Sequence, residues 1–85
     1  MTGSRVLILG AAGMVGRKLA ERLAGAPQLA GGPVKELILH DIVAPPAPRS
    51  TVSTTCLTGN LATEGEAERL ASLRADIVFH LAAIV

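Results

Sequence analysis

The chain begins with an apolar run that gives way to an amphipathic pattern at a group of glycines. Residues 6–9 are Val, Leu, Ile and Leu in succession, which is typical of a strand buried on both faces. Beyond the glycines, Val15, Leu19 and Leu23 recur at helical spacing, while charged residues fall on the opposite side. This pattern predicts a strand, a tight turn and a helix that ends at Gly25.

Later apolar segments predict further strands at residues 35–40, 52–57 and 76–85. Prolines within residues 43–50 exclude a helix between the first two of these strands. That segment is therefore expected to be an extended crossover or a flexible loop. It is short for a parallel return, which makes the pairing of the strand at 52–57 the least specified part of the topology.

A second helix is expected to open at Thr63, because Thr63 and Glu66 have the Thr-x-x-Glu form of a capping box. It would carry Ala67, Leu70 and Ala71 inward and leave its glutamates on a solvated face. Strands that alternate with helices predict an α/β fold. We expect the amino-terminal half of a Rossmann-type doubly wound parallel sheet, with about four strands and two helices.

Composition supports this fold class and excludes several partners. Hydrophobic residues make up 49% of the 85, but only Phe79 is aromatic, so the core must consist of aliphatic residues. The net charge of +1 and the lack of stacking aromatics argue against nucleic acid as a partner. No apolar run is long enough to span a membrane. The single cysteine, Cys56, excludes an internal disulfide, favours a reducing, cytoplasmic location and is expected to fill space in a strand.

The turn after the first strand contains Gly10, Gly13 and Gly16 at intervals of three. Gly10 would let the chain leave the strand sharply, Gly13 would admit a pyrophosphate to the backbone, and Gly16 would let the helix pack closely. The first N–H groups of a helix attract anions, so the pattern predicts a phosphate site. The spacing is not that of a triphosphate loop. A helix-capping turn without a ligand is the alternative.

Asp41 stands at the tip of the second predicted strand. In a dinucleotide-binding unit, an acid there accepts hydrogen bonds from the adenine ribose and repels the 2′-phosphate of NADP. Ile42 follows it rather than an arginine, so we predict NAD as the cofactor. A turn-forming aspartate is the alternative. His40 and Asp41 alone are too few ligands for a metal site, and no metal is predicted.

The last predicted strand is aliphatic, and nothing in the sequence follows it to cover its edge. We therefore expect residues 1–85 to be the amino-terminal part of an NAD-binding Rossmann domain in a longer protein, with the substrate domain outside this chain. His80 is expected to be packed or hydrogen-bonded near the cofactor rather than to act as a general base.

Four features in order carry a family resemblance: the glycine turn, Asp41, the turn Gly59-Asn60-Leu61 and the tail His80-Leu81-Ala82-Ala83. With this set the chain resembles the extended short-chain dehydrogenases/reductases of the NAD-dependent epimerase/dehydratase group, and within it the sugar-acid dehydrogenases. The resemblance implies that the glycine turn holds the pyrophosphate and Asp41 the adenine ribose. Asn60 and Leu61 would flank the adenine, and residues 81–83 would line the path to the nicotinamide. The residues expected to bind NAD are Gly10, Ala12, Gly13, Met14, Val15, Gly16, Asp41, Ile42, Asn60, Leu61, Leu81, Ala82 and Ala83.

The chain departs from the family pattern in two ways that matter. Asn60 stands where an aspartate usually contacts the adenine amino group, although an amide oxygen can accept the same hydrogen bond. The family's acid/base pair is Tyr-x-x-x-Lys, and this chain has no tyrosine, so no catalytic residue is predicted within it. The catalytic residues would lie beyond Val85.

The resemblance implies the NAD-binding part of an oxidoreductase or epimerase that acts on a sugar, a sugar acid or a nucleotide sugar. The alternative is a non-catalytic NAD(P)-binding or interaction module. The sequence does not specify the oligomeric state, and dimers are common in the group, so a homodimer of the full-length protein is compatible with the resemblance.

Overall fold

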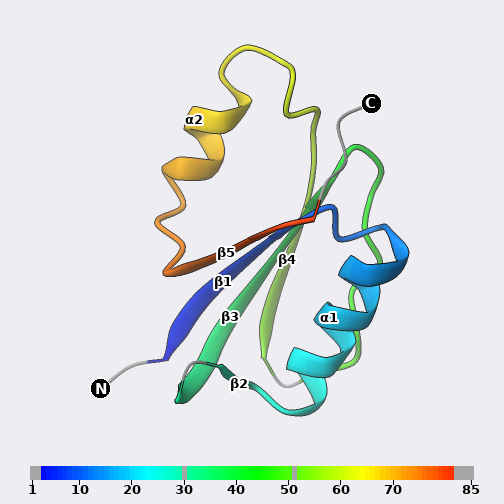
Figure 1. The fold of residues 1–85 in the computed structure, drawn as a ribbon. Helices are drawn as coiled ribbons and strands as arrows, with labels where there is room; N and C mark the ends of the chain where they lie inside the picture. The colour runs from blue at the N-terminus through cyan, green and yellow to red at the C-terminus, as the bar shows by residue number, and fades with distance from the viewer. Residues whose placement is uncertain (1–2, 30, 51, 82–85) are drawn as a thin grey trace.

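A computed structural model describes residues 3–29, 31–50 and 52–81. Within these ranges the chain forms a five-stranded sheet and two helices (Figure 1). In chain order the elements are β1 (Ser4–Leu9), α1 (Met14–Gly25), β2 (Gln28–Leu29), β3 (Gly32–Asp41), β4 (Ser53–Thr58), α2 (Glu66–Ala71) and β5 (Ile77–His80).

Four strands are parallel, and β1 lies between β3 and β5. On the other side of β3 lies β4, which settles the pairing that the sequence left least specified. The register places Leu9 opposite both His40 and His80, and His40 opposite Leu57. The carboxyl ends of all four strands therefore meet at one edge of the sheet, where ligands bind in folds of this kind.

The two helices cover opposite faces of the sheet (Figure 1). Alternate residues of β1 point to opposite faces, because side chains in a strand alternate. The cluster under α1 contains Val6, Ile8, Ala11, Ala20, Leu23, Ala24, Val34, Leu37 and Leu39. The cluster under α2 contains Leu7, Leu9, Ile38 and Leu70. The α/β, doubly wound, parallel arrangement predicted from the sequence is confirmed.

The strand β2 was not predicted. It pairs antiparallel with the start of β3, which begins at Gly32 rather than at residue 35. Gly31, Gly32 and Pro33 indicate a loop by composition, but only Gly31 takes a positive φ, of 79°. A two-residue strand is too short to show periodicity, so the sequence carried no signal for it.

The predicted capping box is wrong. The N-cap of α2 is Gly65, with φ 89°, and no side chain caps the helix. The backbone carbonyl of Thr63 accepts the Glu66 N–H at 3.1 Å, while the Glu66 carboxylate turns away to a different partner. Of the three residues predicted to face inward, only Leu70 is buried, and Ala67 and Ala71 are exposed.

Cys56 is exposed, so the prediction that it fills space in the interior is wrong. It lies on β4, whose residues are exposed or half-buried along its whole length. The proline-rich segment that precedes β4 forms no helix over residues 43–50, as predicted. The Ser50 hydroxyl donates to the Ala24 carbonyl at 3.3 Å, which ties the crossover to the end of α1.

Candidate cofactor-binding site

The glycine turn is fixed to the end of β3 by its backbone. The N–H groups of Gly10 and Ala11 both donate to the His40 carbonyl, at 2.9 and 3.0 Å. Gly10 has φ 91°, a conformation that residues with a side chain rarely adopt. Gly10 is therefore required by the turn itself, whether or not a ligand binds.

Gly16 is also required by packing within the chain. A Cβ at this position would overlap the Gly10 carbonyl oxygen and lie 2.8 Å from the Ala11 Cα. Both are backbone atoms of the turn, so a side chain here would force the first turn of α1 away from β1. The helix-packing role predicted for this glycine agrees with the structure.

Gly13 differs from the other two glycines. Its φ of −77° is open to any residue, and a Cβ there would meet only the Gly10 carbonyl oxygen, at an ordinary 3.5 Å, among the residues the structure describes. Neither the backbone conformation nor internal packing requires a glycine. The open space beside Gly13 is what a phosphate would need to approach the backbone.

The N-terminus of α1 faces this space. Gly13 is its N-cap, no side chain caps it, and its first turn contains no acidic residue. Met14 and Val15 are 75% and 64% exposed although both are apolar. The first N–H groups of a helix have no intrahelical acceptor and carry partial positive charge, so this end of α1 suits an anion.

The Asp41 carboxylate is held against the glycine turn. Its Oδ2 accepts the Ala12 N–H at 2.8 Å, and its Oδ1 accepts the Ile42 N–H at 2.7 Å. Each carboxylate oxygen has a second lone pair that remains able to accept from a ribose hydroxyl. Asp41 thus joins the two predicted parts of the site, a link that sequence reasoning missed.

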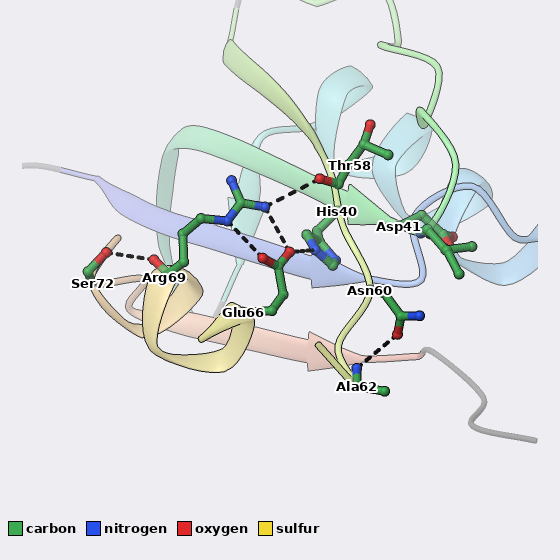
Figure 2. Close-up of polar contacts among 9 residues, drawn as sticks. His40, Asp41, Thr58, Asn60, Ala62, Glu66, Arg69 and Ser72 are labelled. Carbon is green, nitrogen blue, oxygen red and sulfur yellow. Dashed lines mark hydrogen bonds and ion pairs between the residues drawn. The ribbon is translucent and has the colours of Figure 1, made fainter. Parts of the chain in front are cut away.

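The loop after β4 lies beside Asp41. The Gly59 N–H donates to the Asp41 carbonyl at 3.0 Å, and the Asn60 Oδ1 accepts the Ala62 N–H at 2.8 Å (Figure 2). The oxygen that was expected to accept from adenine therefore already has one partner and keeps one lone pair. Leu61 is half-buried and packs against the apolar cluster under α2.

The tail contributes less that can be described. The Leu81 N–H donates to the Leu9 carbonyl at 2.8 Å, and its side chain is 38% exposed at the carboxyl edge of the sheet. Ala82 and Ala83 lie outside the described residues. His80 is exposed, so it is not packed in the interior; a hydrogen-bonded position near the cofactor stays a prediction.

Sequence reasoning missed a polar cluster of His40, Glu66 and Arg69 behind this edge, in which His40 is buried and Arg69 is exposed. The His40 side chain is 2% exposed, and its Nε2 lies 2.6 Å from the Glu66 Oε2 (Figure 2). The Arg69 guanidinium binds both oxygens of the same carboxylate, at 2.9 and 2.7 Å. Hydrogen bonds from Arg69 and from His40 lower the pKa of Glu66 from 4.5 to about 2. The prediction that the helix glutamates are solvated is wrong for Glu66, whose side chain is 11% exposed.

The only sequence signal for this cluster was the polar His40 at the end of an apolar strand, which needs a partner when buried. Its partner is 26 positions away, beyond any local pattern. Within the described ranges, no three His, Cys, Asp or Glu side chains gather as ligands for a metal ion. Nor does any helix there have the length and apolar character needed to cross a membrane.

Comparison with known proteins shows which family this architecture represents. The sequence profile of the NAD-dependent epimerase/dehydratase family matches residues 6–85. The chain belongs to the NAD-dependent epimerase/dehydratase family. The resemblance and the cofactor predicted from the sequence, NAD, are thereby confirmed at the level of the family.

Two relatives of this family member are informative. D-erythronate dehydrogenase of Haemophilus influenzae is 35% identical over 81 residues, which are 95% of this chain and 25% of that protein. The crystal structure of a nucleoside-diphosphate-sugar epimerase from Agrobacterium tumefaciens superimposes with a TM-score of 0.92 at 44% identity. That match covers 100% of this chain and 25% of the other. The chain thus spans about a quarter of the length of the relatives that it matches.

Proposed function

We propose that this chain forms the pyrophosphate- and adenosine-binding part of an NAD-dependent oxidoreductase or epimerase. The observation that carries the proposal is the open space at Gly13, in front of the uncapped N-terminus of α1. A turn that only capped the helix would account for Gly10 and Gly16. At the N-cap, position 13, it would favour a side chain that accepts a hydrogen bond, such as serine or aspartate, at least as much as glycine.

The other predicted positions fit around that space. Met14 and Val15 would present backbone N–H groups to the pyrophosphate, and Gly10 and Ala12 would form the turn beneath it. Asp41, already held by the Ala12 N–H, would accept hydrogen bonds from the adenine ribose. The remaining positions proposed to contact the dinucleotide are Gly16, Ile42, Asn60, Leu61, Leu81, Ala82 and Ala83.

The proposed cofactor is NAD rather than NADP. In the proposed binding mode the Asp41 carboxylate accepts from the adenine ribose, so a 2′-phosphate would bring a second negative charge close to it. Ile42 beside Asp41 is apolar and 62% exposed, and offers that phosphate no positive charge. Like charges at such short range disfavour binding. When bound, NAD supplies a hydride acceptor for oxidation of a carbinol carbon.

The proposed substrate is a sugar, a sugar acid or a nucleotide sugar. Support comes from the two relatives, one named for D-erythronate and the other for a nucleoside-diphosphate sugar. The acid/base tyrosine expected for the family would lie outside residues 1–85, which contain none. A cytoplasmic location and a homodimeric assembly of the full-length protein stay predictions.

A non-catalytic NAD(P)-binding module is the second candidate, because the features identified in residues 1–85 bear on cofactor binding and none of them on catalysis. Mixing the full-length protein with NAD and D-erythronate and following NADH by its absorbance separates the two. Turnover supports the enzyme. NAD binding without turnover on any sugar acid or nucleotide sugar supports the module.

Calorimetric titration of the full-length protein with NAD and NADP tests the site. We expect NAD to bind more tightly by about 100-fold, and Asp41→Asn to weaken NAD binding by about 30-fold, because an amide has one acceptor oxygen for two backbone donors. Asp76→Asn is a matched control, since the Asp76 Oδ2 accepts the Arg5 N–H at the opposite edge of the sheet. Equal binding of NAD and NADP would contradict the proposed role of Asp41.

A further inference from the structure

His40 occupies a position between the parts of the proposed site. Its backbone carbonyl accepts the N–H groups of Gly10 and Ala11 in the glycine turn, and Asp41 follows it in the chain. Its side chain lies on the face of the sheet that α2 covers. Among the described residues, His40 is the one polar residue that is buried. A polar group in that setting requires a partner, and Glu66 supplies one.

The direction of the hydrogen bond between His40 and Glu66 follows from charge. Because Arg69 and His40 hold the Glu66 pKa at about 2, the carboxylate is ionised near neutral pH and can only accept hydrogen bonds. The His40 Nε2 is therefore the donor. With the Arg69 guanidinium on the other side, both Glu66 oxygens are engaged, so the carboxylate is held in one orientation.

The same carboxylate is packed against the start of the loop that follows β4. A Cβ on Gly59 would overlap the Glu66 carboxylate and lie 3.1 Å from an Arg69 nitrogen. Arg69 also reaches the Thr58 carbonyl at 3.4 Å, and the Gly59 N–H donates to the Asp41 carbonyl at 3.0 Å. The backbone at residues 58–59 is thus held between the strand that carries Asp41 and the charged pair on α2 (Figure 2).

We propose that Glu66 is a positioning residue for the adenosine half of the dinucleotide. Through His40 and Arg69 it fixes residues 58–61 relative to Asp41, and so sets where Asn60 stands against the adenine. The inference rests on the proposed function, since it presupposes that Asn60 and Asp41 contact the same ligand. It adds a determinant of affinity that lies behind the site and touches no part of the ligand.

The test is to measure dissociation constants of the full-length protein for NAD and for nicotinamide hypoxanthine dinucleotide, which lacks the adenine amino group. In the wild type we expect tighter binding of NAD. Glu66→Ala should weaken NAD binding about 10-fold and bring the ratio between the two dinucleotides close to one, because a displaced loop loses the contact to the amino group. Glu66→Gln keeps an acceptor oxygen for His40 and should restore part of the ratio.

Glu68→Ala is the matched control, because Glu68 is exposed on the same helix. It should bind both dinucleotides like the wild type. If Glu66→Ala does not fold, Arg69→Gln replaces it, since the Arg69 side chain is 44% exposed and its loss should leave the core intact. We expect that variant to weaken NAD about 3-fold and to lower the ratio as well.

Three results would overturn the inference. The first is an unchanged ratio of the two dissociation constants in both Glu66→Ala and Arg69→Gln. The second is an equal loss of affinity for both dinucleotides, accompanied by a lowered melting temperature. The third is a wild type that binds the two dinucleotides equally well. A wild type that binds no NAD at all would instead refute the proposed function, and the inference with it.

Discussion

The face of the sheet under α1 and the face under α2 are held by different kinds of contact. In the described part of the chain, nine buried aliphatic residues form one cluster under α1, and the glycine turn fits against the helix backbone to backbone. The buried cluster under α2 has four described residues, and an ion pair and a buried histidine lie beside it. An apolar groove of ≈ 260 Å³, lined by residues that include Leu7, Leu70 and Val78, remains open on this second face.

This difference separates stability from binding. Among the described residues the aliphatic cluster under α1 contains more buried side chains than the cluster under α2, so we expect it to make the larger hydrophobic contribution to folding. The polar cluster under α2 buries little apolar surface. Its charge-assisted hydrogen bonds instead set the distances and orientations of the groups that they join. We therefore expect substitutions on the two faces to have distinguishable effects on melting temperature and on ligand affinity.

Truncation of a leucine on each face should give the largest contrast in stability. Leu23 is 4% exposed in the α1 cluster and Leu70 is 5% exposed beside the groove. We expect Leu23→Ala to lower the free energy of unfolding by about 4 kcal/mol and Leu70→Ala by about 2 kcal/mol, because the open groove lets α2 relax into the space. Denaturant titration of the full-length protein measures both, and a larger loss for Leu70→Ala would contradict the comparison.

Gly16→Ala should act through backbone displacement rather than through lost area. The added methyl group overlaps the Gly10 carbonyl oxygen, so the turn and the helix must separate. We expect a loss of about 3 kcal/mol in the free energy of unfolding. Gly25→Ala is the control, since a Cβ at Gly25 meets nothing within 4 Å in the described part of the chain. Equal stability of the two variants would show that the close approach at Gly16 is not needed.

Lowering the pH should isolate the contribution of the polar cluster to the melting temperature. Because the Glu66 pKa is lowered from 4.5 to about 2 in the folded chain, its stabilising contribution is complete above about pH 4.5 and is lost as the pH falls towards 2. Glu66→Gln removes this titration. The melting temperatures of wild type and variant should therefore differ by a few degrees near neutral pH and converge between pH 4.5 and 2. A constant difference down to pH 2 would contradict the pairing.

The α1 face was predictable because its signals are local. Each signal depends only on residues within a few positions of one another. The signals are the run of branched residues, the glycines at fixed intervals and the helical spacing of the leucines. Gly10 and Gly16 are required in the structure by the sharp turn and by the close helix packing for which they were predicted. The ribose-binding role of Asp41 stays a prediction, and its link to the Ala12 N–H joins residues 29 positions apart.

The α2 face was predicted less well because local patterns there compete with distant partners. Thr63 and Glu66 have capping-box spacing, but Gly65 takes a left-handed conformation and the Glu66 carboxylate has a stronger partner in His40. Likewise, the β-branched residues around Cys56 indicate a strand but do not show that β4 stays exposed along its length. Exposure depends on which other elements cover a strand, and no pattern within the strand encodes that.

The central claim is that Gly13 is a glycine for the sake of a ligand and not for the fold. Calorimetric titration of the full-length Gly13→Ala variant with NAD, alongside its melting temperature, tests it most directly. We expect at most a small drop in melting temperature, since among the described residues the new Cβ meets only the Gly10 carbonyl oxygen, at 3.5 Å, and alanine is merely a poorer N-cap than glycine. We expect NAD binding to be weakened by at least about 10-fold, because the methyl group fills the space for the pyrophosphate. Wild-type affinity for NAD in this variant would contradict the claim.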